Sequence, residues 1–457
     1  MADNPALAAA IASGRPVLPV FILDGDTPGK WAPGGASLWW LHHTLASLGE
    51  SFAAAGAPLV LRRGRAADVL RHLAEEVGAA EIHAGRAVEP WARAVMDELV
   101  ASAGVPLHLH RTTLLLDPDA IRTQSGGAYG VFTPFSRACL ARPRPDAPLP
   151  APAAITGASA PSDRLEDGHL LPTKPDWAAG FRANWKPGEA GAADRLGKIV
   201  ASVIAGYDQT RNSPGEDGTS ALSPRLHWGE LSPGQIWNAV ADIEGTGKDT
   251  YLNELLWREF CANLLWHHPD MPDAPLRPEY AGMPVRHDDA DLEAWRRGRT
   301  GIPIVDAGIR QLWHLGWMHN RVRMITASFL VKHLLLPWQE GEAWFWDTLV
   351  DADLASNSAQ WQWIAGCGAD ASPFFRIFNP VLQGRKFDPA GDYVRRWVPE
   401  LARLPDRALQ APWEASATEL AEAGVRLGDT YPRPIVDLAA GRTRALAALK
   451  AISGSAG

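Results

Sequence analysis

The spacing of hydrophobic and polar residues over the first 125 positions predicts strands that alternate with helices. Short apolar runs that end at turn residues, such as R-P-V-L-P-V-F-I-L before D-G-D, are typical of buried strands. Longer stretches with apolar residues three or four positions apart, such as A-A-D-V-L-R-H-L-A-E-E-V before Gly78, are typical of helices. We expect strands at 15–23, 58–62, 81–84 and 106–110, and helices at 5–13, 36–56, 66–77 and 89–103.

This alternation indicates an α/β fold with a mainly parallel, Rossmann-like sheet over residues 1–125. The pattern then changes, because the Pro-rich stretch R-P-R-P-D-A-P-L-P-A-P-A-A (142–154) cannot form regular structure. We interpret residues 126–190 as an interdomain linker. From 191 to 457 the periodicity is helical and strand alternation is scarce, so the sequence predicts a large all-α domain there.

Composition and charge exclude several classes of protein. The 457 residues are 46% hydrophobic and 21% charged, as in ordinary globular proteins. A net charge of −8 argues against a surface coated with Lys and Arg, although it leaves room for a local basic cleft. The three cysteines form no C-x-x-C pair, and no apolar run reaches 18 residues. We therefore expect a cytoplasmic protein with no disulfide scaffold and no contact with a membrane.

Two segments of the helical half carry polar groups suited to a ligand. G-T-S-A-L-S-P (218–224) combines small hydroxyls with free backbone N–H groups, which can hold a phosphate where a helix begins. On its own it also fits a plain helix N-cap. In Y-L-N-E-L-L-W-R-E-F (251–260), Glu254, Trp257 and Arg258 share one helical face. That face fits a ligand site, or a core tryptophan beside a solvated ion pair.

A third segment, G-W-M-H-N-R-V-R-M-I (316–325), places Asn320, Arg323 and Met324 on one face. An amide, a guanidinium and a thioether make a poor core and a plausible pocket. The surrounding residues 295–333 contain one acid, Asp306, against seven cations: Arg296, Arg297, Arg299, Arg310, Arg321, Arg323 and Lys332. In an acidic chain this basic segment fits phosphate binding, or a merely solvated positive face.

A fourth segment, D-A-D-L-A-S-N-S-A-Q-W-Q-W (351–363), sets two carboxylates and an amide before two indoles. The chain holds 20 Trp, far above ordinary usage. On a helix, Trp361 and Trp363 would lie about 200° apart around the axis, so they cannot serve one pocket by the same face.

Other motifs fail. G-T-G-K-D-T (245–250) lacks the first Gly of a phosphate loop and has Asp249 where Ser or Thr would bind magnesium. L-H-L-H (107–110) and W-H-H-P lack an acidic or histidine partner at helical metal spacing, so we interpret these histidines as structural or surface residues and expect no metal site.

Taken together, the four segments resemble the DNA photolyase/cryptochrome family, most closely its cyclobutane pyrimidine dimer photolyases. The resemblance covers nearly the whole chain. It includes V-F-T-P-F (131–135), T-G-I-P-I-V-D-A-G-I-R-Q-L (300–312) and F-F-R-I-F-N-P-V-L-Q-G-R-K-F-D (374–388).

The resemblance implies that the helical domain binds FAD in a folded form. Arg323 would pair with Asp351, and Asn357 would stand near flavin N5, where an amide favours repair over the Asp that is typical of plant cryptochromes. The residues implied in FAD binding are Tyr207, Thr219, Ser220, Ala221, Leu222, Ser223, Tyr251, Glu254, Trp257, Arg258, Asn320, Arg323, Asp351, Asp353 and Asn357.

The resemblance also implies an enzyme, a deoxyribodipyrimidine photo-lyase. Its reaction is light-driven electron transfer from reduced FAD to a dimer flipped out of UV-damaged DNA, and photolyases are themselves a known example of enzymes that flip their target out of the duplex. The implied catalytic residues are Glu254, Asn320, Met324 and Asn357. The implied lesion-binding residues are Trp257, Trp363, Arg321, Met324 and Asn320.

For electron transfer, the resemblance assigns Trp361 next to the flavin and Trp338 as the second relay. The third relay of the family would stand ten residues before Trp295, where this chain has Val285. Trp228, Trp266 and Trp313 are the substitutes that we consider.

Two departures from the family remain. Its members usually begin with a strand before the D-N-P-A-L equivalent, so we expect the first strand of the sheet to be missing and sheet edges to be exposed. Folate-binding residues do not match around V-E-P-W-A-R (88–93), which leaves an antenna chromophore open: a deazaflavin, a flavin, a folate or none. We expect a monomer. A cryptochrome-like photoreceptor and a (6-4) photoproduct photolyase are the alternatives.

Overall fold

The described residues form four short strands, which pair in parallel. In the computed structural model, which describes residues 1–370 and 375–453, β1 (Val20–Leu23) pairs with β2 (Val60–Arg63), and β3 (Ile82–Gly85) pairs with β4 (Leu107–His110). The parallel pairing confirms the prediction. The pairing forms two separate two-stranded sheets, however, because no strand in the described part of the chain joins the β1–β2 pair to the β3–β4 pair.

The chain divides into two units that are each built from separate stretches of sequence. The first unit contains residues 1–205, 220–269 and 350–356, and the second contains 206–219, 270–349 and 357–457, of which 454–457 lie outside the described residues. Residue 374, the first of the motif 374–388, also lies outside them.

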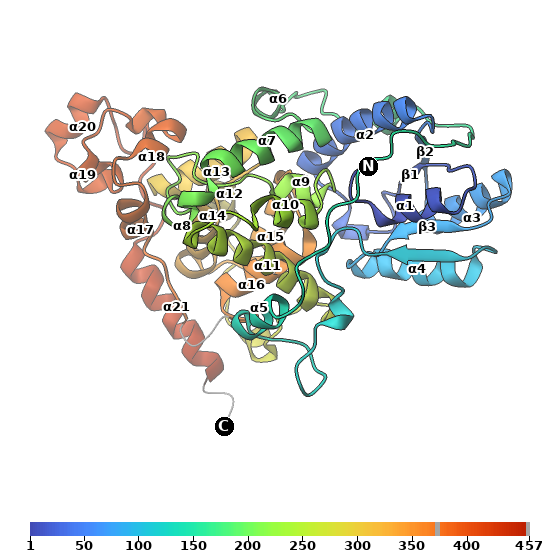
Figure 1. Ribbon diagram of the computed structural model, residues 1–457. Helices are drawn as coiled ribbons and strands as arrows, with labels where there is room; N and C mark the ends of the chain where they lie inside the picture. The colour runs from blue at the N-terminus through green and yellow to red at the C-terminus, as the bar shows by residue number, and fades with distance from the viewer. Residues whose placement is uncertain (371–374, 454–457) are drawn as a thin grey trace. The chain divides into compact units, whose positions relative to one another are not determined.

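The first unit contains the four strands, and the helices nearest to them are those of residues 5–102 (Figure 1). Apolar residues of α3 (Ala66–Val77) and α4 (Pro90–Ser102), such as Ala67 and Leu99, pack with Ile82 and Leu107 of the β3–β4 pair. The Pro-rich segment 142–154 has no helix or strand, as predicted. The helices are α1 (Pro5–Ala12), α2 (Gly35–Ala55), α3 (Ala66–Val77), α4 (Pro90–Ser102), α5 (Phe132–Leu140), α6 (Ala179–Asn184), α7 (Glu189–Ser202), α9 (Ser223–His227), α10 (Pro233–Val240) and α11 (Thr246–His267).

The second unit is helical in its described part. Its helices are α8 (Tyr207–Thr210), α12 (Asp289–Arg296), α13 (Pro303–Leu315), α14 (Asn320–Ser328), a π-helix (Phe329–Leu334), α15 (Trp338–Thr348), α17 (Pro380–Phe387), α18 (Asp392–Trp397), α19 (Asp406–Leu409), α20 (Ala417–Ala423) and α21 (Leu438–Ser453). Helix α16 (Leu354–Ala365) begins in the first unit and continues in the second. None of the described helices is long and apolar enough to cross a membrane.

Buried polar groups hold each unit together. In the second unit, the Asp306 carboxylate accepts hydrogen bonds from the Thr300 backbone N–H (2.7 Å), the Gly301 N–H (3.0 Å) and the Tyr431 hydroxyl (2.6 Å). Burial is the main effect on Asp306 and raises its pKa, whereas the hydrogen bonds from Tyr431 and Thr300 lower it. The motif 300–312 therefore has a structural role at its acidic position.

In the first unit, the Glu230 carboxylate accepts hydrogen bonds from Trp40 Nε1 (2.9 Å), the Thr44 hydroxyl (2.5 Å) and the Gly188 N–H (2.6 Å). Arg225 completes the set with an ion pair at 2.5 Å. Both charged side chains are buried, so each stabilises the other away from water.

Candidate functional site

Helix α11 presents the first group of candidate residues on a face that is neither core nor fully exposed. Glu254, Trp257 and Arg258 are half-buried, whereas Leu255 and Leu256 between them are buried. This burial pattern matches the spacing that the sequence predicts. Tyr251, one turn before Glu254, is buried, and burial raises its pKa to about 12.

The Trp257 indole is held by aromatic side chains of its own unit. Its ring lies parallel to the Phe132 ring, with centroids 3.9 Å apart and 8° between planes, and it meets Phe260 edge-on at 5.7 Å. Phe132 opens α5 and belongs to V-F-T-P-F, a motif for which the sequence predicted no role. Sequence reasoning missed this contact because Phe132 and Trp257 are more than 120 residues apart.

Arg258 is fixed by groups from the first half of the chain. Its Nη1 donates to the Thr113 carbonyl at 2.6 Å and lies 3.5 Å from Glu259 Oε1. Burial raises the pKa of Glu259 to about 7, with Arg258 opposing that shift. Arg258 is therefore oriented by a carbonyl and by a carboxyl group, and it is not a loosely solvated cation.

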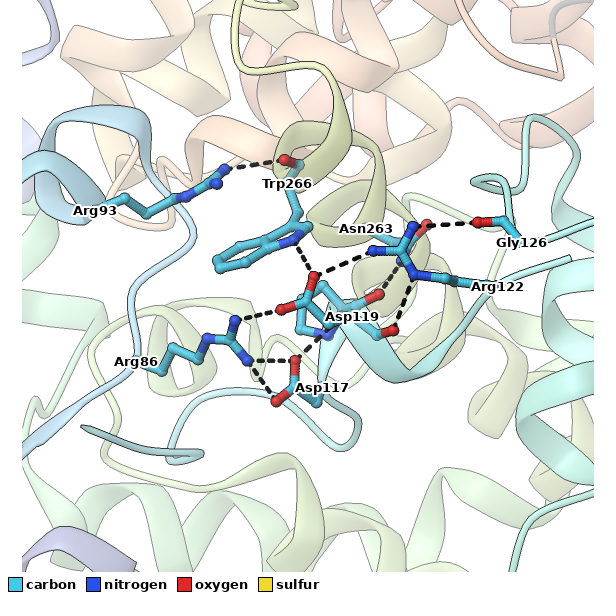
Figure 2. A network of polar contacts seen from close by, with 9 residues as sticks. Arg86, Arg93, Asp117, Asp119, Arg122, Gly126, Asn263 and Trp266 are labelled. Carbon is cyan, nitrogen blue, oxygen red and sulfur yellow. Dashed lines mark hydrogen bonds and ion pairs between the residues drawn. The ribbon is translucent and has the colours of Figure 1, made fainter. Parts of the chain in front are cut away.

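Figure 2 shows how the C-terminal end of α11 is bound to the rest of its unit. The Trp266 indole lies between two guanidinium groups, 4.3 Å from Arg86 and 3.8 Å from Arg93, measured from each guanidinium carbon to the ring centroid. Its Nε1 donates to Asp119 Oδ1 at 2.8 Å, and Arg93 Nη1 donates to the Trp266 carbonyl at 2.9 Å. Asn263, one turn earlier, donates to the Pro118 carbonyl at 3.1 Å. These contacts fix the position of α11 against residues 86–93 and 117–122.

The segment 218–224 forms a loop followed by a helix, as predicted. Helix α9 begins at Ser223, and Ala221 takes a left-handed backbone conformation with φ of 49°. The Ser220 carbonyl accepts a hydrogen bond from Arg195 Nε at 2.8 Å, and the Leu222 N–H donates to the Ser220 hydroxyl at 3.3 Å. Part of the donor capacity of this loop is therefore used inside the protein.

Helix α14 presents the second group, and its burial again follows the predicted face. Asn320 is exposed, Arg323 and Met324 are half-buried, and Val322 and Ile325 between and after them are buried. Arg323 Nε donates to the Met318 carbonyl at 2.8 Å. The pairing of Arg323 with Asp351 stays a prediction.

Arg321 is held within the second unit. Its Nη2 and Nε both donate to Asn212 Oδ1, at 2.6 and 3.1 Å, and its guanidinium lies 4.5 Å from the centroid of the Phe387 ring. His319 caps the helix by accepting from the Arg321 N–H at 3.1 Å. Burial, aided by the nearby guanidinium groups, lowers the pKa of His319 to about 4. This imidazole is therefore neutral at physiological pH.

In the second unit Tyr207, also implied in FAD binding, is buried.

The basic segment 295–333 is less positive in the folded protein than its sequence suggests. Arg296 pairs with Glu340 at 3.0 Å, Arg310 pairs with Glu400 at 2.8 Å, and Arg297 pairs with Glu293. Lys332 is buried and donates to the Ala365 carbonyl at 2.6 Å. Four of the seven cations therefore have partners inside the second unit, and phosphate binding by this segment stays a prediction.

Helix α16 orders the fourth segment. Asp353 Oδ1 accepts from the Ser356 N–H at 2.8 Å, which is the geometry of an N-cap, so this carboxylate helps to start the helix. Asp351 is buried. Asn357 is buried too, and its Nδ2 donates to the Glu342 carbonyl at 3.0 Å.

Both indoles of W-Q-W lie on α16, and they differ in exposure as the 200° separation predicts. Trp361 is buried, with ring centroids 6.3 Å from Trp295 and 5.0 Å from Phe345. Its ring lies directly over Gly341, where an added Cβ would overlap it. Trp363 is half-buried, and its Nε1 donates to the Asp370 carbonyl at 3.1 Å.

The remaining relay candidates occupy three different environments. Trp338 is buried and makes no ring-to-ring contact within residues 1–370 and 375–453. Trp228 is half-buried and donates to the Val350 carbonyl at 2.9 Å. Trp313 is 54% exposed and stacks on Trp344 with centroids 6.0 Å apart and planes 4° apart.

Nearly the whole chain is similar to known proteins. Residues 1–153 match the family model described as DNA photolyase, and residues 251–451 match the model described as FAD binding domain of DNA photolyase. A deoxyribodipyrimidine photo-lyase of Agrobacterium fabrum is 47% identical over 99% of this chain and 96% of that protein. Cryptochrome-1 of Arabidopsis thaliana is 35% identical over 97% of this chain and 67% of that protein. The crystal structure of a bacterial class III photolyase from Agrobacterium tumefaciens matches with a TM-score of 0.94 and 47% identity, over 99% of this chain and 95% of that one.

Proposed function

The chain belongs to the DNA photolyase/cryptochrome family, and from this premise we propose that it repairs cyclobutane pyrimidine dimers in UV-damaged DNA under light. The observation that carries this function is the 47% identity to a deoxyribodipyrimidine photo-lyase over nearly the full length of both proteins. The match to cryptochrome-1 of Arabidopsis thaliana is weaker, at 35% identity.

The residues of the helical half fit FAD, whose binding domain is matched over residues 251–451. Two helix faces, on α11 and α14, carry aromatic, carboxylate, thioether and guanidinium groups that are half-buried rather than packed into a core, and the Asn320 amide on α14 is exposed. When bound, reduced FAD would supply the electron that light transfers to the lesion. We propose that it is held by Tyr207, Thr219, Ser220, Ala221, Leu222, Ser223, Tyr251, Glu254, Trp257, Arg258, Asn320, Arg323, Asp351, Asp353 and Asn357.

The orientation of Asn357 supports a role beside a protonated flavin nitrogen. A backbone carbonyl can only accept, so the atom facing the Glu342 carbonyl at 3.0 Å must be the amide nitrogen. The acceptor Oδ1 is therefore the atom left to meet a ligand. It would accept a hydrogen bond from an N–H at flavin N5 and would stabilise that protonated form.

For the lesion, we propose that Trp257 and Trp363 supply apolar walls, with Glu254, Asn320, Arg321 and Met324 as the polar and thioether groups beside them. The stack of Trp257 on Phe132 supports this role, because an indole already held flat costs less entropy to use as a stacking surface. Arg321 is the proposed phosphate contact. Its hydrogen bonds to Asn212 hold the guanidinium in a fixed position, which supports its use as a contact to the DNA backbone.

For photoreduction, we propose that Trp361 donates to the flavin and that Trp338 follows it. Among the substitutes for the third relay, exposure favours Trp313 as the terminal donor, because more than half of its side chain meets solvent. Trp266 is less suited, since the Arg93 cation lies 3.8 Å from its ring and would oppose oxidation.

Repair of a defined lesion tests the function. Purified, chemically reduced protein is mixed with an oligonucleotide that carries one thymine cyclobutane dimer, and restored thymine is measured by chromatography under blue light and in the dark. We expect repair in light only. Trp338→Phe serves as the matched variant, which should lose photoreduction and keep repair when the flavin is reduced chemically.

Bound flavin without light-dependent repair would contradict the proposal and favour a photoreceptor. Repair of a (6-4) photoproduct in the same assay would contradict the proposed lesion class. The division into residues 1–125, 126–190 and 191–457, the monomeric state and an antenna of deazaflavin, flavin or folate also stay proposals, and sedimentation and the absorption spectrum of the purified protein would test the last two.

A further inference from the structure

One face of the β3–β4 pair carries histidines and a carboxylate that the proposed function does not use. His83 lies opposite His108 in the strand register, and His110 lies two residues further along β4. Alternate residues of a strand point to the same face, so Glu81, just before β3, shares this face with His83. The opposite face carries Ile82 and Leu107, which pack into the core.

The side chains on this face approach one another closely. Glu81 Oε1 lies 3.6 Å from His83 Nε2, and Glu81 Oε2 lies 3.4 Å from His108 Nε2. One donor atom from each of the three residues lies within 4.8 Å of the other two. The His83 and His108 rings are stacked, with centroids 4.9 Å apart. One carboxylate thus faces two imidazole nitrogens at once.

The hydrogen bonding of His83 leaves one nitrogen without a partner. Its Nδ1 lies 3.0 Å from His110 Nε2, while its Nε2 is buried and has no hydrogen bond within the described residues. If Nδ1 carries the proton and donates to His110, the Nε2 lone pair points into the group formed with Glu81 and His108. Metal-binding histidines commonly use their second nitrogen in this way, since the outer hydrogen bond fixes the tautomer.

We propose that Glu81, His83 and His108 form a zinc-binding site, with His110 as a positioning residue. A tetrahedral zinc ion with bonds of 2.0–2.1 Å holds its ligand atoms about 3.3 Å apart, close to the two observed distances. Two imidazoles and one carboxylate are an established zinc donor set, with water in the fourth position. His108 is half exposed, with 47% of its side chain open to solvent, so the ion can enter.

The sequence criterion for metal sites failed here for a physical reason. That criterion considers only partners at helical spacing. L-H-L-H lies on a strand, and its partners Glu81 and His83 lie at the neighbouring strand, 25 or more residues earlier. A zinc ion at this position would clamp β3 to β4. A two-stranded sheet has little stability of its own, so an ion that binds only the folded pairing would stabilise this part of the first unit.

Zinc binding to the untagged full-length protein tests the site. The protein is stripped with EDTA, dialysed and titrated with zinc chloride by calorimetry, in the dark and without DNA. We expect one zinc per chain, at least 100-fold weaker binding in His83→Ala and Glu81→Gln, and about 10–100-fold weaker binding in His110→Ala. His72→Ala, which removes an exposed histidine of α3, is the matched control and should bind zinc like the wild type.

Cobalt(II) gives a second readout, because tetrahedral coordination produces strong visible absorption that surface-bound cobalt lacks. We expect this absorption in the wild type and in His72→Ala, and its loss in His108→Ala, with circular dichroism confirming that each variant is folded. Equal zinc affinity in wild type and His83→Ala, or no stoichiometric zinc in the wild type, would overturn the proposal. Neither readout depends on flavin or on repair. The zinc proposal is therefore tested independently of the proposed function.

Discussion

The first unit and the second unit both gather tryptophans, but they surround them differently. In the first unit, Trp39 and Trp40 are fully buried, and the partners packed against them, including Trp185, are at least half-buried. In the second unit, the buried pair Trp361 and Trp295 also packs against a buried ring, Phe345. Trp313 of this unit stacks on the half-buried Trp344 and is itself 54% exposed.

We call Trp39, Trp40 and Trp185 the first cluster, and Trp295, Trp361, Trp313 and Trp344 the second cluster. The distance between ring centroids does not distinguish these two clusters. Trp40 and Trp185 have centroids 5.3 Å apart, which is closer than the 6.3 Å between Trp295 and Trp361. What differs is the anchoring and the access to solvent, since Trp40 is tied to the buried Glu230 while Trp313 reaches water. A dense set of indoles therefore indicates packing first, and electron transfer from the surface needs an exposed member as well. We order the tests by their expected change in the free energy of unfolding.

The largest change should come from Glu230→Ala in the first cluster. The substitution leaves Arg225 charged and buried without its partner, and it removes the acceptor of Trp40 Nε1. We expect a loss of about 3–5 kcal/mol in the free energy of unfolding, measured by urea denaturation. Glu414→Ala, at an exposed ion pair, is the control and should change stability by less than about 1 kcal/mol. A loss that small in Glu230→Ala would show that this cluster is not held by its buried ion pair.

The next change should come from Gly341→Ala, which acts on the second cluster. The new methyl group would overlap the Trp361 ring, so the indole must move. We expect a loss of about 1–3 kcal/mol by overpacking, together with slower flavin photoreduction under timed illumination. Gly197→Ala, where an added Cβ meets nothing within 4 Å among the described residues, is the control. Unchanged photoreduction would argue against Trp361 as the flavin donor.

A smaller change should follow acidification through His319. Its pKa is about 4 in the folded protein and about 6.5 when unfolded, so between these values the unfolded chain binds a proton that the folded protein does not. Its contribution is therefore full above pH 6.5 and is lost as pH falls. From pH 7.5 to 5.5 it should decrease by about 1 kcal/mol.

His319→Asn keeps a capping acceptor and removes the titration. The unfolding free energy of this variant should vary less between pH 7.5 and 5.5 than that of the wild type, because the other histidines are common to both proteins. An identical dependence in both would exclude His319 as a source of acid sensitivity.

The smallest change in stability should come from Trp313→Phe. The side chain is 54% exposed, so we expect a loss within about 0.5 kcal/mol. Photoreduction should nevertheless decrease several-fold if Trp313 is the terminal donor, as followed by transient absorption of the flavin. Trp266→Phe is the comparison variant, and a larger decrease there would reverse our choice between the two.

Local pattern predicted most of the elements and some of the site. Periodicity predicted the helices at 66–77 and 89–103 and the exposed and buried faces of α11 and α14. It can do so because the buried face of a helix is formed by apolar residues three and four positions apart. The alternation predicted parallel pairing, but it could not predict which strand pairs with which. The apolar run 15–23 was expected to form a buried strand, whereas all four residues of β1 are half-buried. Apolar runs also carry no information on which edge a strand meets.

Contacts between distant segments account for the rest. The stack of Phe132 on Trp257 and the ion pairs of Arg296 with Glu340 and Arg310 with Glu400 join residues that no local spacing relates. The count of cations in 295–333 was therefore a poor guide to surface charge. Roles of single residues at the flavin came from the family resemblance alone.

The discontinuous make-up of the first unit has a consequence for its synthesis on the ribosome. Residues 350–356 belong to this unit, so it cannot be completed until about 150 residues after position 205 have been translated. At about 5–20 residues per second this takes roughly 8 to 30 s, during which the surface that will receive them is open to chaperones. A nascent chain arrested before residue 350 should therefore be more sensitive to protease in its N-terminal half than one released at full length.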